Sequence, residues 1–212
     1  MMLSRRLLLA LIAGAPAGAL ASPCCGPVTE AGARLAVYLD STGVDRLWLP
    51  GFKVNWETGA AISAWDDDKP HTHCSAFVAS IAKRLGVYVL RPPDHSAVLL
   101  ANAQMGWLRS PEAVADGWRP LPDATAAQTR ANLGELVLAA FENPDPHRPG
   151  HIAIVRPSDI DSAALSAEGP LVIQAGGHNA FSEPLARGFA NHRGAWIAGG
   201  GSVRFFAHRL GG

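Results

Sequence analysis

The chain has few cysteines and no excess of either charge. Only 3 of its 212 residues are cysteine, so a dense disulfide framework does not hold it together. Its 18 Lys and Arg are matched by 18 Asp and Glu, and without a basic excess nothing indicates a nucleic-acid partner. Beyond the N-terminal region no apolar run reaches the roughly 20 residues that a membrane-spanning helix needs. These absences favour a globular protein with no stable membrane insertion.

The N-terminal residues have the pattern of an export signal. Ser4-Arg5-Arg6 is followed by the apolar residues 7–13 and then by small residues, which is the order of regions in a signal peptide. The paired arginines resemble the twin-arginine motif, with Leu8 and Ala10 in place of its usual Phe and Lys. The general secretory route is the alternative, and the apolar stretch is too short for a spanning anchor. We expect residues 1–21 to be removed and the protein to be periplasmic or secreted.

The remaining residues, 22–212, have the length of one domain. Loss of Arg5 and Arg6 with the signal would leave a net charge of about −2. There is no internal repeat and no low-complexity linker, and the segments rich in Pro and Gly, such as 143–150, are predicted to be turns. We therefore predict a single domain.

Helical periodicity dominates the first part of this domain and strand-like runs dominate the second. The predicted helices are Glu30–Leu39, a helix capped by Thr72 that ends at Gly86, Ser96–Leu108, Ser110–Ala115 and Asp123–Leu133. The predicted strands are Leu136–Phe141, Ile152–Val155, Leu171–Gln174 and Ser202–Ala207. Helices followed by strands indicate an α+β domain with an antiparallel sheet.

Two of these predicted elements begin with a residue that can do chemistry. Cys74 lies in the first turn of its predicted helix, where unpaired backbone N–H groups and the helix dipole favour a thiolate. His151 opens the strand-like run that follows Gly150. A thiol hydrolase needs such a pair, because the thiolate is its nucleophile and the imidazole is the proton partner.

The motifs around these two residues resemble those of NlpC/P60-type cysteine peptidases and the related CHAP amidases. His73-Cys74-Ser75-Ala76-Phe77-Val78 is similar to the Asp-Cys-Ser-Gly-Phe-Val nucleophile helix of that superfamily, and Gly150-His151-Ile152-Ala153-Ile154 is similar to its Gly-His-Val-Gly-Ile strand. Val172-Ile173-Gln174-Ala175 matches the strand that carries the third polar residue, within a motif resembling Val-His-Ala. His73, Ala76 and a longer segment at 156–170 depart from the family pattern.

The resemblance implies a papain-like fold and an exported enzyme that cleaves an amide bond in the peptides of cell-wall peptidoglycan. Cys74 would attack, His151 would hold and deliver the proton, and Gln174 would orient the imidazole ring. The residues expected to contact substrate are Trp65, His73, Ser75, His178 and Asn179. No cofactor and no metal ion is expected, and acyl transfer on the same scaffold remains an alternative to hydrolysis.

Other interpretations of the polar residues stay open at this point. His71, His73 and Cys74 place three potential metal ligands within four residues, although no zinc-binding signature is present. A non-catalytic cell-wall-binding module on the same scaffold is the second alternative. His178 and Asn179 compete with Gln174 for the orienting role, or are turn residues after a strand. His192 and His208 are expected at the surface.

The three cysteines leave the pairing open. Cys24 and Cys25 are adjacent, and Cys74 has no obvious partner. Cys74 could instead be a small buried hydrophobe, as free cysteines often are. A bridge from Cys24 or Cys25 to Cys74 is also possible from the sequence, and such a bridge would block the nucleophile.

Overall fold

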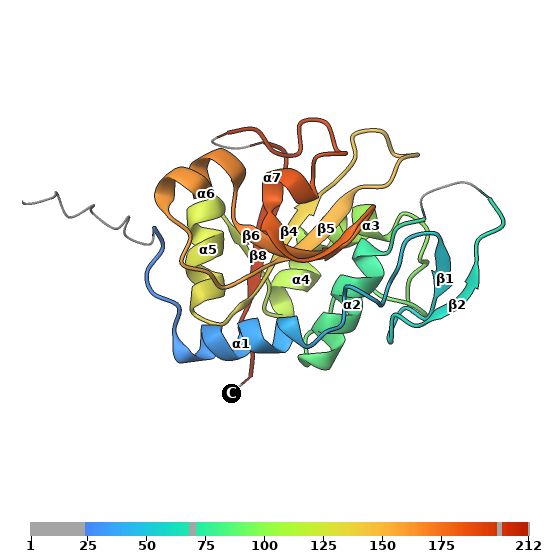
Figure 1. Ribbon diagram of the computed structural model, residues 1–212, viewed down its shortest axis with the longest axis horizontal. Helices are drawn as coiled ribbons and strands as arrows, with labels where there is room; N and C mark the ends of the chain where they lie inside the picture. The colour runs from blue at the N-terminus through green and yellow to red at the C-terminus, as the bar shows by residue number, and fades with distance from the viewer. Residues whose placement is uncertain (1–23, 68–70, 199–200, 212) are drawn as a thin grey trace, which may run out of the picture.

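A six-stranded antiparallel sheet forms the centre of the computed structural model, which describes residues 24–67, 71–198 and 201–211. Its strands, in spatial order, are β3 (Arg119–Leu121), β8 (Arg204–His208), β4 (Leu136–Phe141), β5 (His151–Val155), β6 (Leu171–Ala175) and β7 (Asn179–Pro184). A separate hairpin, β1 (Phe52–Val54) and β2 (Ala61–Ala64), projects beside the main body (Figure 1). The predicted signal peptide, residues 1–21, lies outside the described residues.

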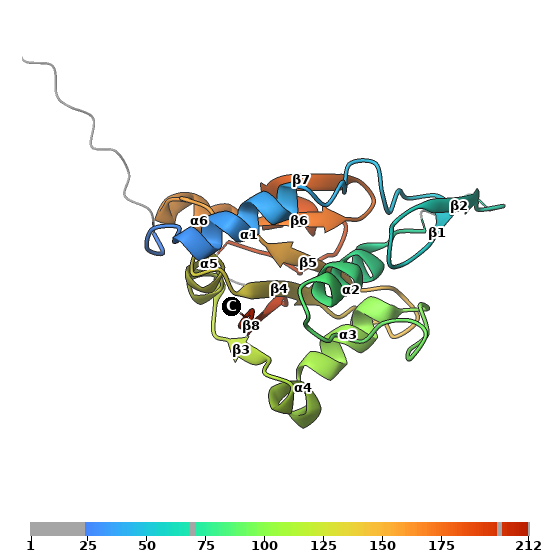
Figure 2. The same cartoon turned by 90° about the horizontal axis from the view of Figure 1, so that it is seen from below.

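Helices cover both faces of this sheet. Figure 2 shows α2 (Cys74–Arg84) and α3 (Leu100–Leu108) on one side and α5 (Ala124–Asn132) and α6 (Ser162–Glu168) on the other. The remaining helices are α1 (Glu30–Asp40), α4 (Pro111–Ala115) and α7 (Leu185–Gly188). Each face of the sheet therefore buries its own apolar core, one beneath α2 and α3 and one beneath α5 and α7.

The alternation of side chains along β5 divides this strand between the two cores. Ile152 and Ile154 pack into the core that contains Cys74 and Phe77 of α2. Ala153 and Val155 pack into the opposite core. Because successive strand residues point to opposite faces, the His151 side chain leaves the strand on the face opposite α2.

The structure confirms the predicted α+β class and most of the predicted elements. α1, α4, α5 and β4 lie within one residue of their predicted bounds, and Ser110 and Asp123, at two predicted helix starts, accept N-cap hydrogen bonds with their side chains. Three predicted starts are wrong. β8 begins at Arg204 rather than Ser202. His73 rather than Thr72 is the N-cap of α2, and α3 begins at Leu100 rather than Ser96, since turns occupy the preceding residues.

The three cysteines form one disulfide and leave one free thiol. Cys24 and Cys25 form a disulfide with each other, and Cys74 is free and buried. No bridge therefore blocks Cys74. Across the described residues, no helix has both the length and the apolar character needed to cross a membrane.

Candidate active site

Cys74 is the first residue of α2, and the start of this helix is left open. Its N-cap, His73, makes no side-chain capping hydrogen bond, whereas Thr29, Ser110, Asp123 and Asp161 cap their own helices in this way. The first N–H groups of a helix have no partner within it. No side chain of the described residues therefore caps the amides at the start of α2, and those of Cys74 and Ser75 face the sulfur of Cys74.

The start of β5 packs tightly against its neighbours because residue 150 is glycine. A Cβ atom at Gly150 would lie 2.2 Å from the carbonyl oxygen of Phe141 and 2.4 Å from Oδ1 of Asn102. Neither contact is tolerable, since real Cβ atoms do not approach other atoms so closely. Glycine thus allows β5 to begin directly beside the end of β4, which fixes the position of His151.

His151 and Gln174 meet on adjacent strands, as the sequence predicted. Nε2 of the His151 ring is hydrogen-bonded to Oε1 of Gln174. Both side chains are buried, at 4% and 1% exposure. Since an amide oxygen only accepts hydrogen bonds, the ring must donate from Nε2, which leaves the lone pair of Nδ1 free to take up a proton.

Two aromatic groups hold the other sides of the ring. Phe189 contacts the His151 ring edge-on, with 4.6 Å between the ring centroids, and His192 stacks on it at 5.2 Å and an angle of 15°. His192 is thus half-buried in the site, and the prediction that it lies at the surface is wrong. Its position comes from the loop after α7, a tertiary contact that no local sequence pattern indicates.

Burial keeps both the imidazole and the thiol uncharged. Burial lowers the pKa of His151 to about 4, although Gln174 and Glu183 favour the protonated ring. Burial also raises the pKa of the Cys74 thiol, against the smaller opposing effect of backbone amides that face the sulfur, foremost that of Ile152. The resting site therefore holds a neutral thiol and a neutral base, because desolvation outweighs the helix start.

The sulfur of Cys74 lies beside the backbone of β5, the strand that begins at His151. The amide that faces the sulfur belongs to Ile152, the residue directly after His151. No hydrogen bond joins the thiol to the imidazole ring among the described contacts, and the thiol is only 4% exposed. The His151 ring leaves β5 on the face opposite α2 and packs against Phe189, so a rearrangement would have to bring the imidazole and the thiol together before they could react.

His178 and Asn179, predicted to contact substrate or orient the histidine, have other partners. Nε2 of His178 lies 2.8 and 2.9 Å from the two carboxylate oxygens of Glu183, which in turn contacts Gln174. The Asn179 side-chain amide donates to the carbonyl oxygens of Val44 and Leu47. His178 thus joins the site indirectly, and Asn179 anchors the loop after α1.

The remaining predicted substrate contacts lie around the β1–β2 hairpin and the start of α2. The ring nitrogen Nε2 of His73 donates to the carbonyl oxygen of Phe52 at 2.8 Å, which ties the hairpin to the start of α2. Trp65 stacks on His71 with 3.9 Å between centroids. The carbonyl of Ser75 accepts a hydrogen bond from Gln104. His73, which directly precedes Cys74, has its pKa lowered chiefly by burial.

The candidate metal ligands do not converge. His71 pairs with Asp67 at 2.5 Å and His73 with a backbone carbonyl, so the two imidazoles bind different partners. Within residues 24–67, 71–198 and 201–211, no group of three or more His, Cys, Asp and Glu side chains is arranged to hold a metal ion.

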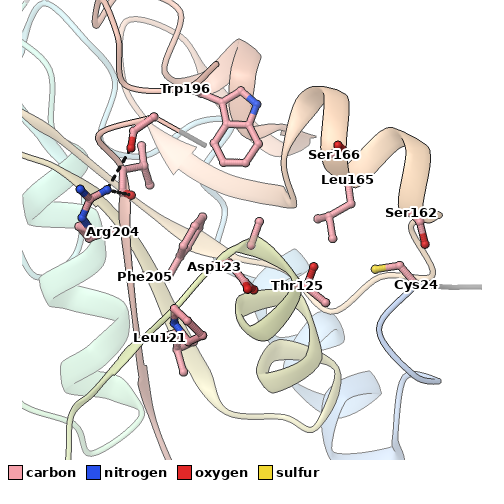
Figure 3. A pocket seen from close by; sticks show the side chains of 14 residues that line it. Cys24, Leu121, Asp123, Thr125, Ser162, Leu165, Ser166, Trp196, Arg204 and Phe205 are labelled. Carbon is pink, nitrogen blue, oxygen red and sulfur yellow. Dashed lines mark hydrogen bonds between the residues drawn. The ribbon is translucent and has the colours of Figure 1, made fainter. Parts of the chain in front are cut away.

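A separate cavity of about 560 Å³ lies on the side of the sheet covered by α5 and α6, between these helices and the loop before β8 (Figure 3). Trp196, Leu165 and Phe205 point into it, and Asp123, Thr125 and Ser162 stand at the starts of the two helices. Cys74, His151 and Gln174 do not line this cavity. It is therefore distinct from the candidate active site.

A comparison of the sequence with models of protein families finds no matching family, and a comparison with curated proteins finds no match.

Proposed function

We propose that this protein is an exported cysteine hydrolase of the NlpC/P60 and CHAP type that cleaves an amide bond in peptidoglycan peptides. The observation that carries the proposal is the buried hydrogen bond between His151 and Gln174, at a strand whose next amide faces the sulfur of Cys74. His151 and Gln174 thus meet as a base and its orienter would, and the order of the three residues along the chain is that of nucleophile, base and orienter. The export signal and the motif resemblance support the choice of peptidoglycan.

In the proposed mechanism a rearrangement first brings Nδ1 of His151 beside Cys74, and His151 then acts as a general base. Nδ1 takes the thiol proton as Sγ of Cys74 forms a bond to the substrate carbonyl carbon, and the N–H groups at the open start of α2 bind the resulting oxyanion. The tetrahedral intermediate collapses as the imidazolium protonates the leaving amine, which leaves a thioester. Water, deprotonated by His151, then releases the acid and restores the thiol.

Gln174 differs in charge from the carboxylate found in many triads. Its amide oxygen can orient the imidazole, but it stabilises the imidazolium less than a carboxylate would. We therefore expect catalysis to depend strongly on correct ring orientation. An amine in place of water at the thioester would give acyl transfer by the same steps.

The test is digestion of purified muropeptides with residues 22–212, followed by mass spectrometry. We expect fragments that gain the mass of one water across a single amide bond, with no loss of activity in the presence of a metal chelator. The fragments would identify the bond, either within the stem peptide or between muramic acid and L-alanine. A protein that binds these fragments without cleaving them would contradict the proposal.

A non-catalytic binding module is the second candidate, and the near-complete burial of Cys74 favours it. In that case the thiol would be a packing residue of the α2 core. The cavity beside Trp196 would then be a more accessible place for a ligand, since aromatic side chains commonly line such sites. Binding that survives Cys74→Ala but is lost in Trp196→Ala would support this second candidate.

A further inference from the structure

Glu183 is a buried carboxylate that the proposed mechanism does not use. It lies in β7 with 6% exposure, and Glu135 is the only other buried carboxylate of the described residues. Glu135 has an evident structural role, because Arg119 and Arg130 pair with it at 2.7 and 3.4 Å. Glu183 instead faces the candidate site.

The carboxylate of Glu183 contacts the back of Gln174. Nε2 of Gln174 donates to Oε1 of Glu183 at 2.7 Å. His178 reaches both carboxylate oxygens, and Nε of Arg187 lies 3.4 Å from Oε2. The side chains of His178 and Arg187 are 49% and 75% exposed, so a continuous chain of polar contacts runs from the surface to the buried ring of His151.

The chemistry of the carboxylate fixes the direction of every hydrogen bond in this chain. A carboxylate only accepts, so it must face the NH2 end of the Gln174 amide. The amide oxygen is then turned to the imidazole, and Nε2 of His151 must carry the hydrogen. A reversed amide would set two acceptors against each other at Glu183 and would place the hydrogen on Nδ1, where the ring could not accept the thiol proton.

The surroundings of the amide leave it little room to move. A Cβ atom at Gly188 would lie 3.1 Å from Oε1 of Gln174, and one at Gly176 would lie 3.3 Å from Cε1 of His151. Glycine at both positions admits the amide and the ring, while close packing limits their displacement. The orientation of the amide is therefore decided by its two hydrogen-bond partners.

We propose that Glu183 is a positioning residue that sets the tautomer of His151 through Gln174 and so makes Nδ1 the base. The catalytic consequence rests on the proposed hydrolase function. The tautomer of His151 does not depend on that function, because it is a property of the protein without substrate. Glu183 touches neither the thiol nor the ring: it positions the ring through the amide, and its charge also favours the protonated imidazole.

The experiment compares Glu183→Gln and Glu183→Met with the matched control Glu135→Gln. The ¹⁵N shifts of the His151 ring, assigned with His151→Gln, report which nitrogen carries the hydrogen at pH 7. We expect hydrogen on Nε2 in the wild type and the control, and a mixture of the two tautomers in the Glu183 variants. The share with hydrogen on Nδ1 should be larger in Glu183→Met, because methionine removes the hydrogen-bond acceptor. With muropeptide substrate, kcat should fall by about 10-fold to 100-fold while KM changes little.

Each outcome decides the matter. An unchanged tautomer in both folded Glu183 variants overturns the proposal, even where kcat falls, since the loss would then be structural. If Glu183→Met does not fold, Glu183→Gln carries the same test. A changed tautomer in a protein whose wild type cleaves nothing would support the positioning role and contradict the hydrolase.

Discussion

Cys74→Ala and His151→Gln are each expected to lower kcat/KM for muropeptide cleavage by about 10⁴-fold. Alanine removes the nucleophile, and glutamine keeps a polar side chain in the buried site but cannot exchange a proton. Because the two residues act as one unit, the double variant should be scarcely slower than either single variant. Rates of product formation, followed by chromatography and mass spectrometry, measure all three.

The control for these variants is His147→Gln, which changes an exposed histidine of the loop before β5. Its activity should equal that of the wild type. Circular dichroism spectra should confirm that Cys74→Ala keeps the fold, since alanine is close to cysteine in size. Wild-type rates in the Cys74→Ala variant would rule out the proposed nucleophile, and independent, multiplicative losses in the double variant would rule out the paired action.

Acid is expected to destabilise the fold between pH 6.5 and pH 4 through His151. The folded protein holds the pKa of this histidine at about 4, below its ordinary value of 6.5, so the unfolded chain binds more protons in this range. The stabilisation is fully present above pH 6.5 and is lost as the pH falls toward 4. The shift corresponds to about 3 kcal/mol of unfolding free energy. His192 shifts in the same direction, with burial as the main cause.

Urea denaturation at a series of pH values measures this effect. The free energy of unfolding of His151→Gln should fall less steeply from pH 6.5 to 4 than that of the wild type, whereas His147→Gln should follow the wild type. Acidic groups titrate in all three proteins and cancel in the comparison. Parallel curves for the wild type and His151→Gln would show that the buried ring does not have the depressed pKa on which the neutral pair depends.

Local signals in the sequence were sufficient for the main helices and for the inner strands. The apolar face of α2, the capping side chains of Ser110 and Asp123, and the buried run of β4 each act within a few residues. The short strands were missed because tertiary pairing makes them. β3 contains Pro120 and is defined by its partner β8, and the sequence does not predict β7, since the two glycines before His178 and Asn179 indicate a turn.

The residues of the candidate site also divide into those that local sequence patterns indicate and those that only tertiary contacts bring in. The sequence motifs nominated Cys74, His151 and Gln174, and the structure brings the last two into hydrogen-bond contact. Glu183 and His192 could not be found in this way, since they reach the site from β7 and from the loop after α7.

The most direct test of the central claim, that Cys74 is the nucleophile served by His151, is covalent labelling with a stem peptide that ends in an electrophilic ketone. Peptide mapping by mass spectrometry should find one adduct on Cys74, and muropeptide hydrolysis should disappear in step with its formation. Labelling should be much slower in His151→Gln, which lacks the base. Hydrolysis that persists after Cys74 is fully labelled would contradict the account.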